Sequence, residues 1–154
     1  MHLTIPLPKL LRRVLLASVG LAIYAFGNYL TIKADIGQSP WNVFTLGLTN
    51  YIPVTYGQMS IIVSFQVVAT DLLLREPIGV GTLLDAVLVG AFYDLYDSWN
   101  LVPVIENFWL GLVVMVAGLV VLSSSEYLYM SACLACGPRD ALMVGVGKRL
   151  KRLP

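Results

Sequence analysis

Charge is scarce in this sequence, and the charges that do occur are clustered. Of the 154 residues, only 12% are charged, whereas 58% are hydrophobic. Ordinary soluble domains carry roughly twice that charged fraction, so the composition argues against a water-soluble protein. The formal net charge of +1 leaves no basic excess to neutralise phosphates, which argues against nucleic acid as a partner.

Cysteine and histidine are rarer still. With only Cys133 and Cys136, the chain cannot build the disulfide framework of a small secreted domain. Their Cys-x-x-Cys spacing is also found in redox and metal sites, but a zinc ion needs a larger ligand set, and the single histidine is His2. We therefore expect no metal and no cofactor, and we interpret the cysteines as small residues packed in a loop.

The familiar catalytic motifs are missing as well. The sequence has no nucleophile elbow of the Gly-x-Ser-x-Gly type, no His-Glu-x-x-His motif, no phosphate-binding P-loop and no dinucleotide-binding glycine set. We therefore expect that the protein is not an enzyme.

Long hydrophobic runs, by contrast, dominate the chain. Four of them are long enough to cross a membrane: Val14–Ile32, Tyr56–Leu74, Ile78–Tyr96 and Asn107–Met130. A spanning helix needs about 20 mainly apolar residues, and in lipid its backbone groups must be satisfied within the segment. We expect an all-α, multi-pass protein of the inner membrane, forming one domain over residues 1–154. The basic cluster at residues 9–13 predicts a cytoplasmic N-terminus.

Two further apolar segments are too short to cross. Pro40–Ile52 and Pro138–Leu150 would each give roughly 20 Å of helix, against a hydrocarbon core of about 30 Å. Each begins with proline, which is favoured in the first turn of a helix. We interpret them as half-helices. If they re-enter, only Lys33 among the basic residues lies outside, whereas crossing would also place Arg75 and Arg139 there, so the positive-inside rule favours re-entry.

The two half-helices belong to a repeat. The segments ADIGQSPWNVF (34–44) and ACLACGPRDAL (132–142) both follow a long apolar run, and both place Asn or Asp two positions after a proline. An offset of 98 positions aligns the surrounding sequence without a gap, and the identical pairs are Gly20/Gly118, Leu21/Leu119, Tyr29/Tyr127, Leu30/Leu128, Ala34/Ala132, Pro40/Pro138 and Gly47/Gly145. We predict repeat 1 at about 14–97 and an incomplete repeat 2 at about 107–150. Re-entrant half-helices would leave an odd number of crossings between the copies and thus an inverted repeat.

Several stretches also carry a family resemblance. KADIGQSPWNVFTLGL, YGQMSIIV, PIGVGTLLDAVLVGAFYDL and CGPRDALMVGV occur in this order. Together they resemble the YczE/YyaS/YitT-like bacterial membrane proteins over about residues 15–148. The resemblance implies a polytopic inner-membrane protein and no particular chemistry.

The chain departs from that family pattern in two respects. Cys133 and Ala135 stand where relatives usually have glycine, and relatives continue through further spans beyond the position of Pro154. We therefore expect that the chain is a truncated family member, a naturally split one, or one whose second repeat is completed by a homodimer or a separate chain.

The tips of the half-helices predict a binding site. A helix N-terminus carries partial positive charge and free N–H groups, and broken helices within inverted repeats bind substrates in many transporters. We predict that a small solute, anionic by this argument, binds between the tips at Ser39, Trp41, Asn42, Arg139 and Asp140. The alternative is an ordinary Gly-x-Pro loop between packed helices, with Asp140 capping its helix and Arg139 in an ion pair.

Two acidic residues complete the predicted substrate site. Asp85 lies in the middle of an apolar run, where a carboxylate costs at least about 2.5 kcal/mol on insertion scales and should therefore face the protein interior. It could couple transport to a proton or cation, or simply bond to a neighbouring helix. Glu126 aligns with Asn28, so both side chains are expected at the repeat interface, with snorkelling of Glu126 as the alternative. Asp94 and Asp97 are expected to be solvated.

The function expected from these features is a small-solute membrane transporter or a transporter-like carrier, with the lipid bilayer and an unidentified solute as its partners. The alternatives are a non-transporting accessory or assembly subunit, and a truncated family member without independent activity.

Overall fold

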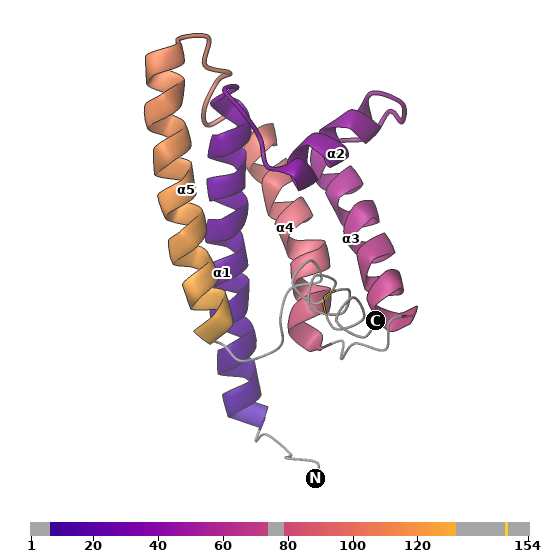
Figure 1. Ribbon diagram of the computed structural model, residues 1–154. Coiled ribbons are helices and arrows are strands. Elements are labelled where there is room, and N and C mark those ends of the chain that lie inside the picture. Colours follow the sequence, from indigo (N-terminus) through magenta and orange to yellow (C-terminus); the bar gives the residue numbers. More distant parts are fainter. Residues whose placement is uncertain (1–6, 74–78, 132–146, 148–154) are drawn as a thin grey trace.

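The computed structural model describes residues 7–73 and 79–131 together with Gly147, and all regular structure in these residues is helical (Figure 1). The helices are α1 (Leu7–Lys33), α2 (Pro40–Thr49), α3 (Tyr56–Leu73), α4 (Val80–Ser98) and α5 (Phe108–Ser131). The predicted all-α class is therefore confirmed for the described part of the chain. The second predicted half-helix, at 138–150, lies almost entirely outside it.

The four long helices run alternately in opposite directions (Figure 1). The last turns of α1 and α4 and the first turns of α3 and α5 meet at one end of the molecule, where α2 also lies; we call it the α2 end. There the Lys33 ammonium is 2.8 Å from the Asp97 carboxylate, and the backbone N–H of Ile105 donates to the Lys33 carbonyl at 3.0 Å. Because α2 connects the last turn of α1 to the first turn of α3, both of its ends lie at this end of the bundle (Figure 1).

The boundaries of α2 follow from its sequence. Ser39 is extended, and its hydroxyl accepts a hydrogen bond from the backbone N–H of Asn42 at 3.3 Å, which caps the first turn. Pro40 occupies the first helical position, where its missing N–H costs nothing. The helix ends at Thr49, earlier than the predicted Ile52, and with 10 residues it is about 15 Å long.

The antiparallel helices α1 and α5 pack through small residues. A Cβ atom on Gly20 would lie 3.1 Å from the backbone nitrogen of Tyr129 and 3.4 Å from the carbonyl oxygen of Ser125. One on Gly27 would lie 3.0 Å from the carbonyl oxygen of Gly118. Small side chains let helix backbones approach closely, which favours association between helices in lipid.

These contacts join positions that the predicted repeat aligns. With the offset of 98 positions, Gly118 aligns with Gly20 (20 + 98 = 118) and Ser125 aligns with Gly27 (27 + 98 = 125). The contact of Gly20 with Ser125 and the contact of Gly27 with Gly118 therefore join the same two aligned positions. The two contacts differ only in which helix supplies which position. A two-fold axis between α1 and α5 would produce this relationship.

Helices α3 and α4 approach each other most closely at Gly57 and Gly90, where a Cβ on either glycine would clash with the carbonyl oxygen of the other. Next to this contact, the Asp94 carboxylate accepts hydrogen bonds from the Gly57 backbone N–H at 2.9 Å and from the Thr55 hydroxyl. Asp94 thereby caps α3 from a neighbouring helix, and Asp97 pairs with α1. Both were expected only to be solvated, and both instead connect helices.

Large apolar side chains cover much of the outer surface of the bundle. On α5, the exposed ones are Phe108, Trp109, Leu110, Leu112, Val113, Val116, Leu119, Val120, Tyr127 and Met130. Of the described helices, α5 and the Leu11–Lys33 part of α1 are long and apolar enough to cross a membrane. This surface suits lipid rather than water.

Candidate functional site

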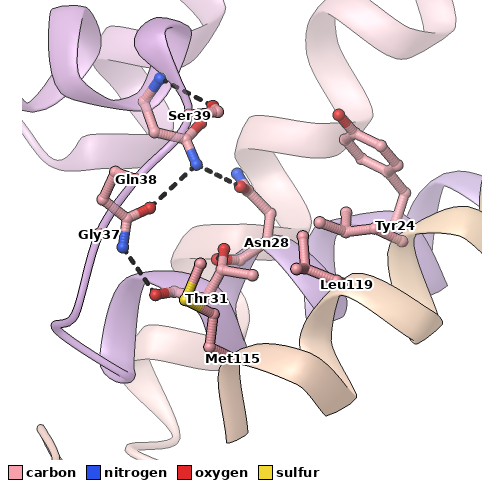
Figure 2. A pocket seen from close by; sticks show the side chains of 10 residues that line it. Tyr24, Asn28, Thr31, Gly37, Gln38, Ser39, Met115 and Leu119 are labelled. Atoms are coloured by element: carbon pink, nitrogen blue, oxygen red, sulfur yellow. Dashed lines mark hydrogen bonds between the residues drawn. The ribbon is translucent and has the colours of Figure 1, made fainter. Parts of the chain in front are cut away.

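A pocket of about 440 Å³ lies at the tip of α2, where α1, the 34–39 linker and α5 meet (Figure 2). Its lining divides into two kinds of surface. The polar side chains come from α1, the linker and α2: Tyr24, Asn28, Thr31, Gln38, Ser39 and Asn42. The apolar side chains come from α5: Met115, Leu119 and Leu122. The pocket is therefore amphipathic.

A closed ring of three hydrogen bonds holds the tip of α2 in place. Asn42 Nδ2 donates to Asn28 Oδ1 at 2.7 Å, Asn28 Nδ2 donates to the Tyr56 hydroxyl at 3.2 Å, and that hydroxyl donates to Asn42 Oδ1 at 2.9 Å. Asn28 and Asn42 are only 5% and 4% exposed. Because buried amides are costly unless bonded, this ring fixes α2 to both α1 and α3.

The linker is fastened to α1 by Gln38. Its Nε2 donates to the carbonyl oxygen of Thr31 at 2.6 Å, and its Oε1 accepts from Asn42 Nδ2 at 3.2 Å (Figure 2). The Thr31 hydroxyl in turn donates to the carbonyl oxygen of Asn28 at 2.8 Å. The polar side chains that line the pocket are therefore held in place by hydrogen bonds to one another and to the backbone of α1.

Charge is absent from this lining in the part of the chain that the structure describes. The basic residue at the end of α1, Lys33, pairs with Asp97 and lies 5.4 Å from the centre of the Tyr29 ring. In the described residues no cluster of three or more His, Cys, Asp or Glu could hold a metal ion. The described lining offers hydrogen bonds and apolar contact.

The structure brings together part of the predicted first tip. Ser39 and Asn42 both line the pocket, in contact with the linker and α1. Trp41 is half-buried beside them and is not a lining residue; its carbonyl oxygen accepts from the Thr45 hydroxyl at 2.8 Å within α2.

The predicted acidic and second-tip residues lie elsewhere. Asp85 is half-buried on α4, and Glu126 is exposed on α5; neither lines the pocket. Arg139 and Asp140 lie outside the described residues, so their predicted role stays a prediction.

Sequence reasoning missed several residues of the site. Tyr24 and Thr31 lie four and three positions from Asn28, which was expected only at the repeat interface. The three share one face of α1, and this polar stripe in an apolar run was a usable signal. Tyr56 gave none, because its role depends on how α3 packs against α2. Asp71 was also overlooked; this acidic residue of α3 is fully buried, although it lies in an apolar run as Asp85 does.

Comparison with known proteins places the chain in a family. Residues 11–153 match the model of a family of unknown function, DUF6198. The chain belongs to this family. The DUF6198 chain is 37% identical over 127 residues to the Bacillus subtilis "uncharacterized membrane protein YczE". The matched region covers 81% of this chain and 58% of YczE. The resemblance identified from the motifs is thereby confirmed.

Two more relatives extend the comparison. An uncharacterized protein of Haemophilus influenzae is 26% identical over 129 residues, covering 84% of this chain and 58% of that protein. YyaS of Bacillus subtilis, an uncharacterized protein, is 27% identical over 137 residues, covering 87% of this chain and 68% of YyaS. The DUF6198 chain thus spans 58% of the length of the first two relatives. No solved structure matches it.

Proposed function

We propose that the protein is a small-solute membrane transporter or a transporter-like carrier, and that the pocket at the α2 tip forms part of its substrate site. The observation that carries this proposal is a cavity built against the N-terminus of the short helix α2 and lined by buried, mutually bonded amides. Discontinuous helices that present their N-terminal tips to a central cavity are a recurring feature of transporters.

The proposed topology has α1, α3, α4 and α5 as spans and α2 as a re-entrant half-helix. With 18 and 19 residues, α3 and α4 are about 27 to 29 Å long, close to the hydrocarbon thickness of about 30 Å. Both ends of α2 lie at the same end of the bundle, which supports re-entry (Figure 1). The name of YczE, a membrane protein, supports the proposed location in the bacterial inner membrane.

The proposed orientation places the N-terminus in the cytoplasm. Arg12 and Arg13 lie in the first half of α1, whereas Lys33 lies at the α2 end. In this orientation Arg12 and Arg13 lie on the cytoplasmic side, as the positive-inside rule requires. Lys33 then lies outside, where Asp97 balances its charge.

The proposed repeat is inverted. Its supports are the antiparallel course of α1 and α5, the aligned copies, and the exchanged contacts of Gly20 with Ser125 and Gly27 with Gly118. Inverted repeats place two related half-helices around one site, so we keep Arg139 and Asp140, which together carry no net charge, as the proposed second tip. Asp85 stays the proposed coupling carboxylate.

A ligand screen on the purified protein tests this function. Amino acids, sugars, nucleosides and short-chain acids are added singly, and the thermal unfolding midpoint is measured in detergent. A solute at 100 times its Kd should stabilise the protein by about 2.7 kcal/mol, because it binds only the folded state. The same solute should not stabilise the Asn42→Ala variant, but should stabilise Gly47→Ala, whose site on α2 has open space around it.

Uptake of a labelled hit into proteoliposomes then separates transport from binding. A stabilising solute that enters vesicles carrying the wild-type protein, but not vesicles carrying Asn42→Ala, supports a transporter. If no class of solute shifts the midpoint, the accessory-subunit alternative becomes the better account.

A further inference from the structure

The polar side of the pocket presents hydrogen-bond donors. The bonds within it use one of the two Nδ2 hydrogens of Asn28 and one of the Nε2 hydrogens of Gln38. The Ser39 hydroxyl accepts from the Asn42 backbone, which leaves its own hydrogen for another acceptor. Among the described lining residues, these groups therefore keep three hydrogens that are not used in the bonds described above.

The N-terminus of α2 adds to this preference. The tip directs partial positive charge and backbone N–H groups toward the pocket, which favours an acceptor oxygen there. The amides of the ring fix the position of the tip, so the donors are in place before a solute arrives.

The opposite side of the pocket makes a charged solute costly. Met115, Leu119 and Leu122 contribute only apolar surface, and an ion that exchanges water for such a surface needs a partner of opposite charge. No charged side chain is present among the described lining residues. Lys33, the basic residue nearest along α1, is already bonded to Asp97.

Building on the proposed function, we propose that this pocket binds an uncharged solute that has an acceptor oxygen at one end and an apolar body. The oxygen would face Asn28, Gln38 and Ser39, and the apolar body would face α5. The volume of about 440 Å³ is typical of small-molecule sites, which run from about 300 to 1,000 Å³. The anionic solute expected from the sequence rested on the helix tips and Arg139, and the described lining supplies no such cation.

Thiol modification with reagents of different charge tests this selectivity without a known substrate. Gly37 lines the pocket, and a Cβ there would meet nothing within 4 Å, so Gly37→Cys adds a thiol with little disturbance. The background is Cys133→Ser and Cys136→Ser. Purified protein in detergent is treated with ethyl methanethiosulfonates of similar size carrying a hydroxyl, a sulfonate or a trimethylammonium group, and modification rates are read by mass spectrometry.

Tyr51→Cys in the same background is the matched control, because Tyr51 is 88% exposed at the α2 end, outside the pocket. Each rate at position 37 is divided by the rate of the same reagent at position 51. We expect the normalised rate of the neutral reagent to exceed those of both charged reagents at least tenfold. Ser39→Cys repeats the measurement if Gly37→Cys does not fold.

The outcomes separate the inference from the function on which it rests. A normalised rate that is highest for the sulfonate, or equal for all three reagents, overturns the uncharged-solute proposal and leaves the transporter proposal standing. If no reagent reaches position 37 or 39 while position 51 reacts, the pocket is closed to solutes, and both proposals fail.

Discussion

The hydroxyl of Tyr56 donates a hydrogen bond to the side-chain oxygen of Asn42 at 2.9 Å, and so joins the first residue of α3 to the tip of α2. The same hydroxyl accepts from Asn28 of α1 at 3.2 Å. One phenol therefore connects three helices at the edge of the pocket. The position of α2 depends on it, although Tyr56 itself does not line the pocket.

Removing this hydroxyl should loosen the tip. Tyr56→Phe leaves two buried amide groups short of a partner, so we expect the free energy of unfolding to fall by about 1 to 3 kcal/mol. Tyr51→Phe is the control, because Tyr51 is 88% exposed and should change stability by less than about 0.5 kcal/mol. Unfolding of both variants is followed by circular dichroism in mixed detergent micelles.

The ring also predicts coupling between its members. In a double-mutant cycle of Tyr56→Phe and Asn42→Ala, the two losses should not add, and the interaction energy should be about 0.5 to 2 kcal/mol. Additive losses would mean that the bonds of the ring form independently of one another.

The contact between α3 and α4 should tolerate no methyl group. Gly57→Ala would drive a Cβ into the backbone of α4 and the Asp94 carboxylate, so we expect a loss of about 1 to 3 kcal/mol or failure to fold. Gly47→Ala has free space in the last turn of α2 and should stabilise the helix by up to about 1 kcal/mol. Thermal midpoints in detergent compare the pair, and equal midpoints would contradict the close packing.

Neutralising two acidic residues should change the free energy of unfolding by different amounts. Asp71 is fully buried on α3, whereas Glu126 is exposed on α5. We expect Asp71→Asn to lower the free energy of unfolding by about 1 to 3 kcal/mol, since buried charged groups depend on their local partners. Glu126→Gln should change it by less than about 0.5 kcal/mol. A larger effect at Glu126 would reveal a contact outside the described part of the chain.

Labelling from outside the cell should separate the two ends of the bundle. In the background lacking both native cysteines, we expect Glu106→Cys, exposed at the α2 end, to react with an impermeant thiol reagent in whole cells. Glu76→Cys, between α3 and α4, should react only after the membrane is broken. Labelling of position 76 from outside would mean that α2 crosses the membrane, and the inverted repeat would lose its support.

The sequence predicted the helices well because their ends are marked by local chemistry. Ser39 and Pro40 define the start of α2, and the long apolar runs define the other helices to within a few residues, except that α1 begins earlier. Ser39 and Asn42 were found from the tip motif alone. These signals depend only on neighbours in the chain.

Contacts between helices were beyond such reasoning. Nothing near Asp94 in the sequence indicates that it caps α3, and nothing near Tyr56 indicates its bonds to Asn28 and Asn42. These roles depend on the rotation and register of packed helices. Gln38 stands in the quoted motif, but its bond to Thr31 requires the linker to fold back along α1.

The order of the chain has a consequence for synthesis. Asn28, Asn42 and Tyr56 all leave the ribosome before α5, so their ring can close while the last described helix is still being made. The apolar wall with Met115, Leu119 and Leu122 arrives afterwards and docks along Gly20 and Gly27. The pocket is therefore completed late, and loss of α5 would leave a nascent bundle that has α2 in place and one side of its cavity open to lipid.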